Sequence, residues 1–115
     1  MEINTTYFMV MSRPCRPSCV QETLDAAVPE LERHAATGGG RVLCISASIK
    51  VEADAHRVIA GALEAFGRLD FLVNNGGGQF GQAAADMALK GWTAVVETNL
   101  TGVKNILEAF FQFNP

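Results

Sequence analysis

The feature that most constrains the fold is an alternation of short apolar runs with longer amphipathic segments. Three apolar runs, each bounded by polar residues, glycine or proline, predict buried strands. They are residues 7–11, 41–46 and 69–73. Three segments with apolar side chains at helical spacing predict helices. They are residues 20–31, 51–66 and a last segment that begins near Lys90. This order predicts a parallel sheet with helices on its faces and right-handed crossovers.

Local signals indicate where the helices begin, bend and end. Ser18 followed three residues later by Gln21 has the pattern of a capping box. Pro29 lies inside the first helical segment and predicts a kink there. Gly67 directly follows the second helical segment, where a left-handed residue is favoured.

Length, composition and charge limit the class of protein. The chain has 115 residues, of which 49% are hydrophobic and 18% are charged, which predicts one globular domain over residues 1–115. A net charge of -3 argues against nucleic acid or a membrane surface as the partner. We expect no membrane-spanning helix and no secretory signal.

The cysteines and histidines predict no metal site. Cys15 and Cys19 form a C-x3-C pair, and two further ligands would have to come from His34 and His56. Unpaired thiols are the simpler interpretation. An odd number of cysteines, three with Cys44, is typical of a reducing compartment.

Two glycine runs differ in their context. Residues 37–40 follow a helical segment and precede a strand, so we interpret them as a connector. Residues 76–78 follow a strand, but the next convincing helix begins about a dozen residues later, so no helix end would meet a phosphate there. These glycines let the backbone pass a flat group at the carboxyl end of the sheet, or form a loop that only needs positive φ.

Three segments in this order resemble the short-chain dehydrogenase/reductase superfamily. Residues 74–77 are similar to its NNAG segment, and residues 97–102 are similar to the N-x-x-G stretch of its fifth helix. Residues 64–70 match the usual approach to NNAG. The run in residues 75–80, with Lys-Gly-Trp at 90–92, resembles the branch that reduces trans-2-enoyl-CoA thioesters in peroxisomes.

The resemblance implies a partial Rossmann-like, three-layer α/β fold in which three parallel strands alternate with three helices. We expect the family's first strand and its TGxxxGxG loop to be absent. In the doubly wound order that strand lies between the strands at residues 7–11 and 69–73, so three outcomes are open. The strands at residues 7–11 and 69–73 pair directly with each other, or the position of the missing strand stays open with unpaired amides. In the third outcome the chain folds only in part. We expect direct pairing.

The resemblance also implies a cofactor site for NADPH. Arg13, with Ser12, lies where NADP-dependent relatives hold the 2′-phosphate, and the alternative is a solvated arginine in a proline-rich turn. Ser48 and Ile49 align with the Asp/Asn-Val pair that contacts adenine. Serine departs from that pair because one hydroxyl cannot reproduce the two bonds of an amide.

The remaining implied residues lie in the glycine run and the last helix. Asn75 is expected to face the adenosine ribose or to tie the strand ends together, and Gly76 lets the cofactor pass. Asn99 matches the asparagine of the catalytic tetrad, which orders a water in the proton relay to the catalytic lysine. The alternative for Asn99 is a polar residue at a helix kink.

The implied function is that of a fragment of an NADPH-dependent oxidoreductase that reduces trans-2-enoyl-CoA thioesters in fatty-acid metabolism. Whether this chain is itself an enzyme is left open, because it holds no YxxxK pair and no tyrosine after Tyr7, and we expect it to be inactive alone. One alternative is a non-catalytic oligomerisation module, since Phe110, Phe111 and Phe113 end an apolar stripe that suits a homo-oligomer. Another is a short-chain reductase of 3-oxoacyl or alcohol specificity. The resemblance implies a peroxisomal location. These residues contain no targeting signal. If the reductase is not peroxisomal, we expect it in the cytoplasm.

Overall fold

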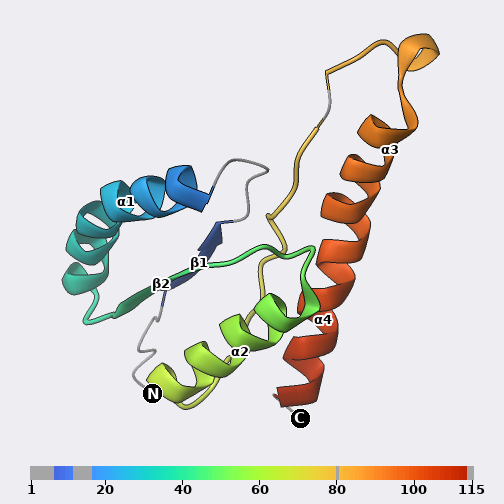
Figure 1. The fold of residues 1–115 in the computed structure, drawn as a ribbon. Coiled ribbons are helices and arrows are strands. Elements are labelled where there is room, and N and C mark those ends of the chain that lie inside the picture. Colours follow the sequence, from blue (N-terminus) through green and yellow to red (C-terminus); the bar gives the residue numbers. More distant parts are fainter. Residues whose placement is uncertain (1–6, 12–16, 80, 114–115) are drawn as a thin grey trace.

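The computed structural model describes the backbone of residues 7–11, 17–79 and 81–113, with side chains from residue 22 onward (Figure 1). The elements are β1 (Tyr7–Met11), α1 (Pro17–Thr37), β2 (Val42–Ser46), α2 (Glu52–Phe66), η1 (Ala84–Asp86), α3 (Leu89–Val96), η2 (Glu97–Thr101) and α4 (Gly102–Phe113). The expectations for Ser12, Arg13 and Cys15 fall outside the described residues, as does the side chain of Cys19.

The sheet of the described residues has two parallel strands. β1 pairs with β2 over five positions, from Tyr7 opposite Val42 to Met11 opposite Ser46. Helix α1 packs against this pair on one side, and α2 contacts β2 on the other (Figure 1). The prediction of two parallel strands with helices on both faces is confirmed for this part of the fold.

The prediction of a third strand at residues 69–73 is wrong. These residues run without regular secondary structure, and the two-stranded sheet does not include them. Leu69 and Leu72 pack against the core between α2 and α4, whereas Phe71 is 90% and Val73 is 83% exposed. The expected direct pairing with β1 is therefore also wrong. An apolar run becomes a strand only where a neighbouring strand supplies the hydrogen-bond ladder.

Helix α1 begins at Pro17, so Ser18 lies within its first turn. The prediction that Ser18 caps this helix is wrong. Proline suits the first helical position because it lacks an N–H, and the N–H at that position has no partner within the helix. Pro29 lies inside α1, and its kink stays a prediction.

Helix α2 agrees with its prediction at both ends. It starts after Val51, and Gly67 follows it in the left-handed conformation with φ 80°. The Gly67 N–H donates to the Leu63 carbonyl over 2.7 Å, which closes the helix. The core lies where α2 packs on α4. It consists of Ile49, Ala55, Ile59, Ile106 and Ala109.

The last helix is continuous from α3 through η2 to α4, and we call it the long helix. Its prediction from Lys90 is confirmed, but a π-helical turn, η2, lies in its middle. A π-turn contains more residues than an α-turn, so the regular bonding of nearby carbonyls changes. The Thr98 hydroxyl donates to the Ala94 carbonyl over 2.8 Å, and the Asn99 amide donates to the Val95 carbonyl over 2.9 Å.

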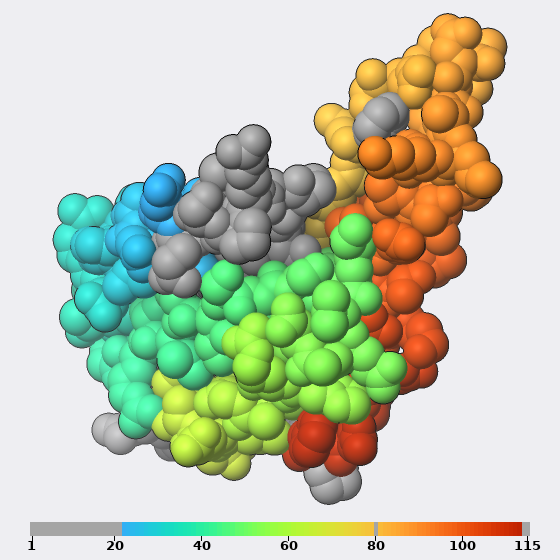
Figure 2. Space-filling view, viewed as in Figure 1, coloured from blue at the N-terminus to red at the C-terminus, as the bar shows by residue number. Residues whose placement is uncertain are grey.

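The start of the long helix projects from the rest of the molecule. In Figure 2, residues 81–88 and α3 extend beyond the body formed by the strands, α2 and α4. Among the described residues, no helix is both long enough and apolar enough to cross a bilayer.

Candidate functional site

Three segments meet near the carboxyl end of β2. The first is the β2–α2 turn, residues 47–51. The second is the glycine segment, residues 74–78. The third is the long helix around η2. In open α/β folds the ligand binds outside the carboxyl ends of the strands, so this meeting point is the candidate site.

A carboxylate and a guanidinium hold the β2–α2 turn. Asp54 lies in the first turn of α2, and its Oδ2 accepts the Ser48 backbone N–H over 2.8 Å. Arg57 Nη2 donates to Asp54 Oδ1 and to the Ser46 carbonyl, each over 2.8 Å. The Ser48 N–H, followed by Arg57, lowers the pKa of Asp54 below its usual value. The ionised carboxylate thus fixes the backbone at Ser48.

Ile49 is the packing centre of the site and is only 5% exposed. A Cβ on Gly76 would lie 2.8 Å from Ile49 Cδ1, and a Cβ on Gly102 would lie 2.7 Å from Ile49 Cγ1. At Gly102 the new Cβ would also approach the Cβ of Ile49, so the whole side chain would have to move, whereas at Gly76 only the end of the Ile49 side chain would have to shift. The Ile49 carbonyl accepts a bond from Asn105 Nδ2 over 3.0 Å. The turn and the glycine segment are therefore packed together through one side chain.

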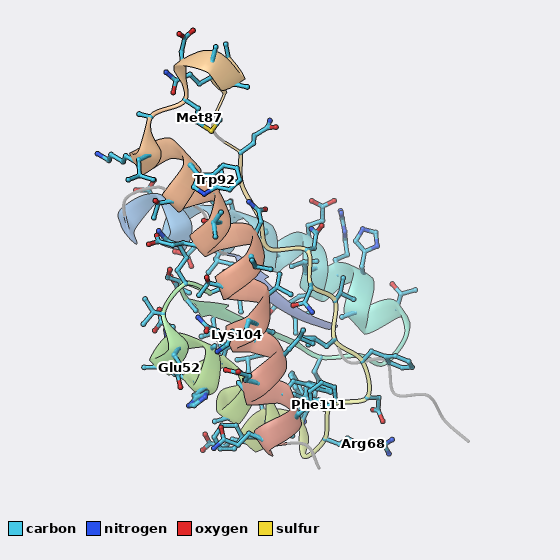
Figure 3. All side chains as sticks on the ribbon, turned by 90° about the vertical axis from the view of Figure 1, so that its right-hand side faces the viewer. Glu52, Arg68, Met87, Trp92, Lys104 and Phe111 are labelled. Carbon is cyan, nitrogen blue, oxygen red and sulfur yellow. The ribbon has the colours of Figure 1, made fainter. Side chains whose placement is uncertain are left out.

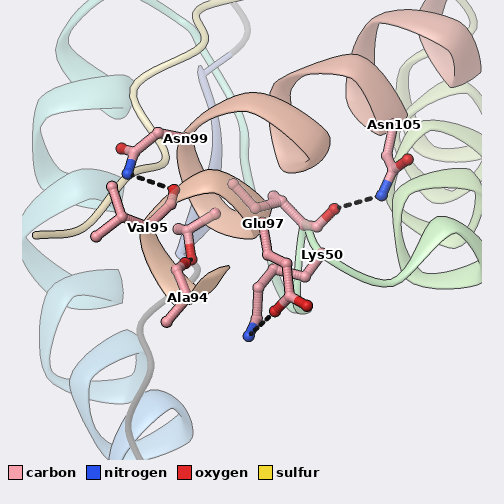
Figure 4. A network of polar contacts seen from close by, with 8 residues as sticks. Lys50, Ala94, Val95, Glu97, Asn99 and Asn105 are labelled. Carbon is pink, nitrogen blue, oxygen red and sulfur yellow. Dashed lines mark hydrogen bonds and ion pairs between the residues drawn. The ribbon is translucent and has the colours of Figure 1, made fainter. Parts of the chain in front are cut away.

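Asn99 binds the glycine segment with both ends of its amide. Its Oδ1 accepts the Gly78 N–H over 3.1 Å, and its Nδ2 donates to the Gly78 carbonyl over 2.7 Å. The same Nδ2 donates to the Val95 carbonyl, which Figure 4 shows as a dashed line. A Cβ on Gly77 would lie 2.6 Å from Asn99 Oδ1, so a side chain at this position would displace the Asn99 amide. Asn99 thus joins the glycine segment to the π-turn.

The structure brings together four of the residues that the sequence predicted. Ile49 contacts Gly76, Ser48 adjoins Ile49, and Asn99 binds the next part of the glycine segment. Asn75 is exposed, and its N–H donates to the Val73 carbonyl over 3.1 Å. Ile49 is buried and the Ser48 N–H is bonded to Asp54, so neither the Ile49 side chain nor this N–H is free to contact a ligand.

Sequence reasoning missed Asp54 and Asn105. Asp54 is the third residue of α2, where an acidic side chain often reaches back to a free N–H. Asn105 is a polar residue between Gly102 and Ile106 on the buried face of α4, and a polar residue on an apolar face was the available signal.

Comparisons with known proteins identify the family. The profile of the short-chain dehydrogenase family matches residues 9–113, and the chain belongs to this family. Its members are oxidoreductases with a nucleotide cofactor. A Bacillus subtilis (strain 168) protein described as a probable 2,4-dienoyl-CoA reductase that produces (2E)-enoyl-CoA is 37% identical over 76 residues. The match covers 66% of this chain and 30% of that protein.

Two further matches extend the comparison. A peroxisomal 2,4-dienoyl-CoA reductase of Arabidopsis thaliana is 29% identical over 93 residues, which are 81% of this chain and 30% of that protein. A crystal structure of a variant actinorhodin polyketide ketoreductase with NADPH superposes with a TM-score of 0.73 at 27% identity. It covers 91% of this chain and 36% of the ketoreductase. The chain thus spans about a third of the length of these proteins.

Proposed function

We propose that the chain forms one wall of the NADPH site of an oxidoreductase that reduces trans-2-enoyl-CoA thioesters in fatty-acid metabolism. The observation that carries the proposal is the joint packing of the β2–α2 turn, the glycine segment and Asn99 at the carboxyl end of β2. This is the edge at which open α/β sheets bind nucleotides. The ketoreductase that superposes on the chain was crystallised with NADPH, which supports the choice of cofactor.

Each residue of this wall has a proposed role. Ser48 and the backbone of Ile49 face the adenine, since the Ile49 side chain is buried, and Asn75 faces the ribose. Gly76, whose Cα lies against the Ile49 side chain, lets the cofactor pass along its other side. Arg13, with Ser12, binds the 2′-phosphate, since a guanidinium is suited to a phosphate. Replacement of Arg13 by alanine is then expected to weaken NADPH binding more than NADH binding, as measured by calorimetry. An equal loss of affinity for both nucleotides would show that Arg13 does not bind the 2′-phosphate.

Asn99 is the proposed catalytic residue of this wall. Both ends of its amide bind Gly78, and its Nδ2 also bonds to Val95, so the side chain is held in one orientation. Its proposed catalytic contribution is to order a water in the proton relay to the family's catalytic lysine. Its bonds to Gly78 also hold the glycine segment beside the π-turn. When bound, NADPH supplies a hydride to the β-carbon of the enoyl thioester, while the α-carbon receives a proton.

The substrate class is supported by two relatives that act on related thioesters. Both are named as 2,4-dienoyl-CoA reductases, one producing (2E)-enoyl-CoA and the other (3E)-enoyl-CoA. The ketoreductase, by its name, fits a different specificity, for keto groups. A chimaera tests this. Residues 42–113 replace their counterpart in the Bacillus subtilis relative, and NADPH oxidation is measured with trans-2-enoyl-, 2,4-dienoyl- and 3-oxoacyl-CoA.

We expect the chimaera to raise kcat/KM for the trans-2-enoyl substrate relative to the parent enzyme. A gain only for the 3-oxoacyl substrate would favour the ketoreductase specificity instead. The 115-residue chain alone is expected to bind NADPH weakly and to show no turnover, because it holds no tyrosine after Tyr7 to serve as the acid. Measurable NADPH oxidation by this chain would overturn that expectation.

The peroxisomal relative supports a peroxisomal location for the reductase. Because these residues hold no targeting signal, the test follows the whole reductase in cell fractions with an antibody raised against the chain. Recovery with a peroxisomal marker is expected, and recovery in the soluble fraction alone would contradict the proposal.

A second candidate function rests on the exposed apolar side chains of the long helix. Leu89 is 77%, Trp92 is 60%, and Leu100 and Phe111 are each 68% exposed. Figure 3 shows Trp92 near one end of this helix and Phe111 near the other. A surface of this kind suits self-association in a non-catalytic module. Light scattering that shows a monomer at high concentration would exclude this function, and a dimer that Leu100→Ser dissociates would support it.

A further inference from the structure

Asn105 is a buried polar side chain for which the proposed site has no role. It is 4% exposed and lies on α4 beside the apolar Ile106 and one turn before Ala109. An amide in such surroundings lowers stability unless it is hydrogen-bonded. Asn105 Nδ2 donates to the Ile49 carbonyl over 3.0 Å, a contact between residues 56 positions apart in the sequence (Figure 4). This bond thus ties α4 to the β2–α2 turn.

Two other contacts join the long helix to the same turn. The Ile49 side chain lies against the Cα of Gly102, where no Cβ would fit. Lys50 Nζ and Glu97 Oε2 form an ion pair over 3.4 Å. This pair is exposed and therefore adds little to stability. The buried contacts through Gly102 and Asn105 are the ones that determine where the backbone of Ile49 lies.

The same helix also holds the glycine segment. Asn99 lies in η2, six positions before Asn105, and its amide binds the Gly78 N–H and carbonyl. Because η2 and α4 are continuous, one rigid element is bonded to the glycine segment at Asn99 and to the turn at Asn105. A shift at either bond changes the distance between the two.

We propose that Asn105 is a positioning residue, which sets the spacing between the β2–α2 turn and the glycine segment and thereby the nucleotide affinity. Asn105 acts through the Ile49 carbonyl and does not touch the nucleotide. The inference rests on the proposed function, since both segments belong to the proposed NADPH site.

The test compares Asn105→Leu with Val58→Ala in the full 115-residue chain. Leucine keeps the branched shape of the asparagine side chain, although it is larger, and removes the donor. Val58 is fully buried in α2, so its truncation lowers stability without touching the Ile49 carbonyl. The two variants are compared at the same loss in the free energy of unfolding. We expect Asn105→Leu to weaken NADPH binding about tenfold or more. Val58→Ala is expected to change NADPH binding by less than about twofold.

The second readout is hydrogen exchange at the amides of Ile49 and Gly78. Asn105→Leu is expected to lower their protection factors more than Val58→Ala does, at equal loss of global stability. If protection and affinity fall only in proportion to global stability in both variants, Asn105 is merely structural and the proposal is overturned.

A third variant, Asn105→Asp, is expected to restore the hydrogen bond to the Ile49 carbonyl at low pH. The introduced carboxyl donates a hydrogen bond to the Ile49 carbonyl only when it is protonated. Protection at Ile49 is therefore expected to approach that of the wild type as the pH is lowered through the pKa of this carboxyl, and to be lost above it. If protection at Ile49 in Asn105→Asp did not change with pH, the proposed hydrogen bond would be contradicted.

The two proposals can fail separately. If the wild-type chain shows no NADPH binding in calorimetry, the proposed function is contradicted. The exchange data still decide whether Asn105 holds the turn and the glycine segment together. If NADPH binds and Asn105→Leu leaves its affinity unchanged, only the role of Asn105 is overturned.

Discussion

Two connections flank α2, the β2–α2 turn before it and residues 69–73 after it, and they are held in different ways. The β2–α2 turn is fixed by the buried Ile49, by Asn105 and by the Asp54–Arg57 pair. Residues 69–73 contact the core through Leu69 and Leu72, while their other apolar side chains face solvent. Apolar residues are the majority in both segments. The comparison shows that apolar composition does not decide how firmly a connection is held, because contacts with distant elements do.

The largest expected effect is that of Ile49→Ala. The side chain fills the space between Gly76 and Gly102, so its truncation leaves a cavity in the site. We expect the free energy of unfolding to fall by about 3 kcal/mol, as measured by chemical denaturation. Val73→Ala is the matched control, since Val73 is 83% exposed, and its expected change is below about 0.5 kcal/mol. If both variants lost the same free energy of unfolding, the β2–α2 turn would be held no more firmly than residues 69–73.

A somewhat smaller loss is expected for Gly102→Ala. In an exposed helix this change would stabilise by about 1 kcal/mol. Here the new Cβ would lie 2.7 Å from Ile49 Cγ1, and the overpacking is expected to produce a net loss of about 1–2 kcal/mol. Adding Ile49→Val removes a methyl group beside the new Cβ. In a double-mutant cycle this second change is expected to recover part of the loss. If the changes in the free energy of unfolding simply added, a contact between residue 102 and Ile49 would be contradicted.

The Asp54→Asn variant is expected to cost about 1 kcal/mol at pH 7, a value reduced by the partial exposure of the pair. The pKa of Asp54 is lowered in the folded protein, so the carboxylate contributes stability above its unfolded pKa. This contribution is lost as the pH falls through the folded pKa. Denaturation curves of the two proteins should therefore converge at acidic pH. A difference that stays constant with pH would contradict the role of the charge.

The smallest effect is expected for Phe71→Ser. Phe71 is 90% exposed, so the change removes little buried surface and should alter stability by less than about 0.5 kcal/mol. Leu72→Ala, at the neighbouring residue that packs on the core, is expected to cost about 1–2 kcal/mol. Thermal unfolding of both variants sharpens the comparison within one segment. A larger loss for Phe71→Ser would show that residues 69–73 pack on another surface in solution.

The sequence predicted those elements whose signals are local. The periodicity of residues 51–66 and the glycine after them located α2 almost to the residue. The failure at residues 69–73 has a different origin, since an apolar run predicts burial but the hydrogen-bond ladder depends on a neighbouring strand. Ser18 failed as a cap because Pro17 already starts the helix. Local patterns alone could not show which of two competing start signals prevails.

The candidate site could be predicted in part for the same reason. Asn99 and Gly76 lie in motifs with recognisable spacing, and the structure places them beside the same turn. Asn105 has no such motif. Its bond joins residues 56 positions apart, and no pattern within one helix indicates that partner.

The π-turn at Glu97–Thr101 has a consequence for the angular phase of the long helix. Six residues of an ideal α-helix rotate a side chain by 600°, which leaves Asn105 about 240° from Asn99. The wider turn changes this angle, so the direction in which α4 presents Asn105 relative to Asn99 depends on η2. Inserting one residue between Gly102 and Asn105 would turn Asn105 by about 100° and remove its bond to the Ile49 carbonyl. The irregular turn therefore contributes to the phase that places Asn105 beside Ile49.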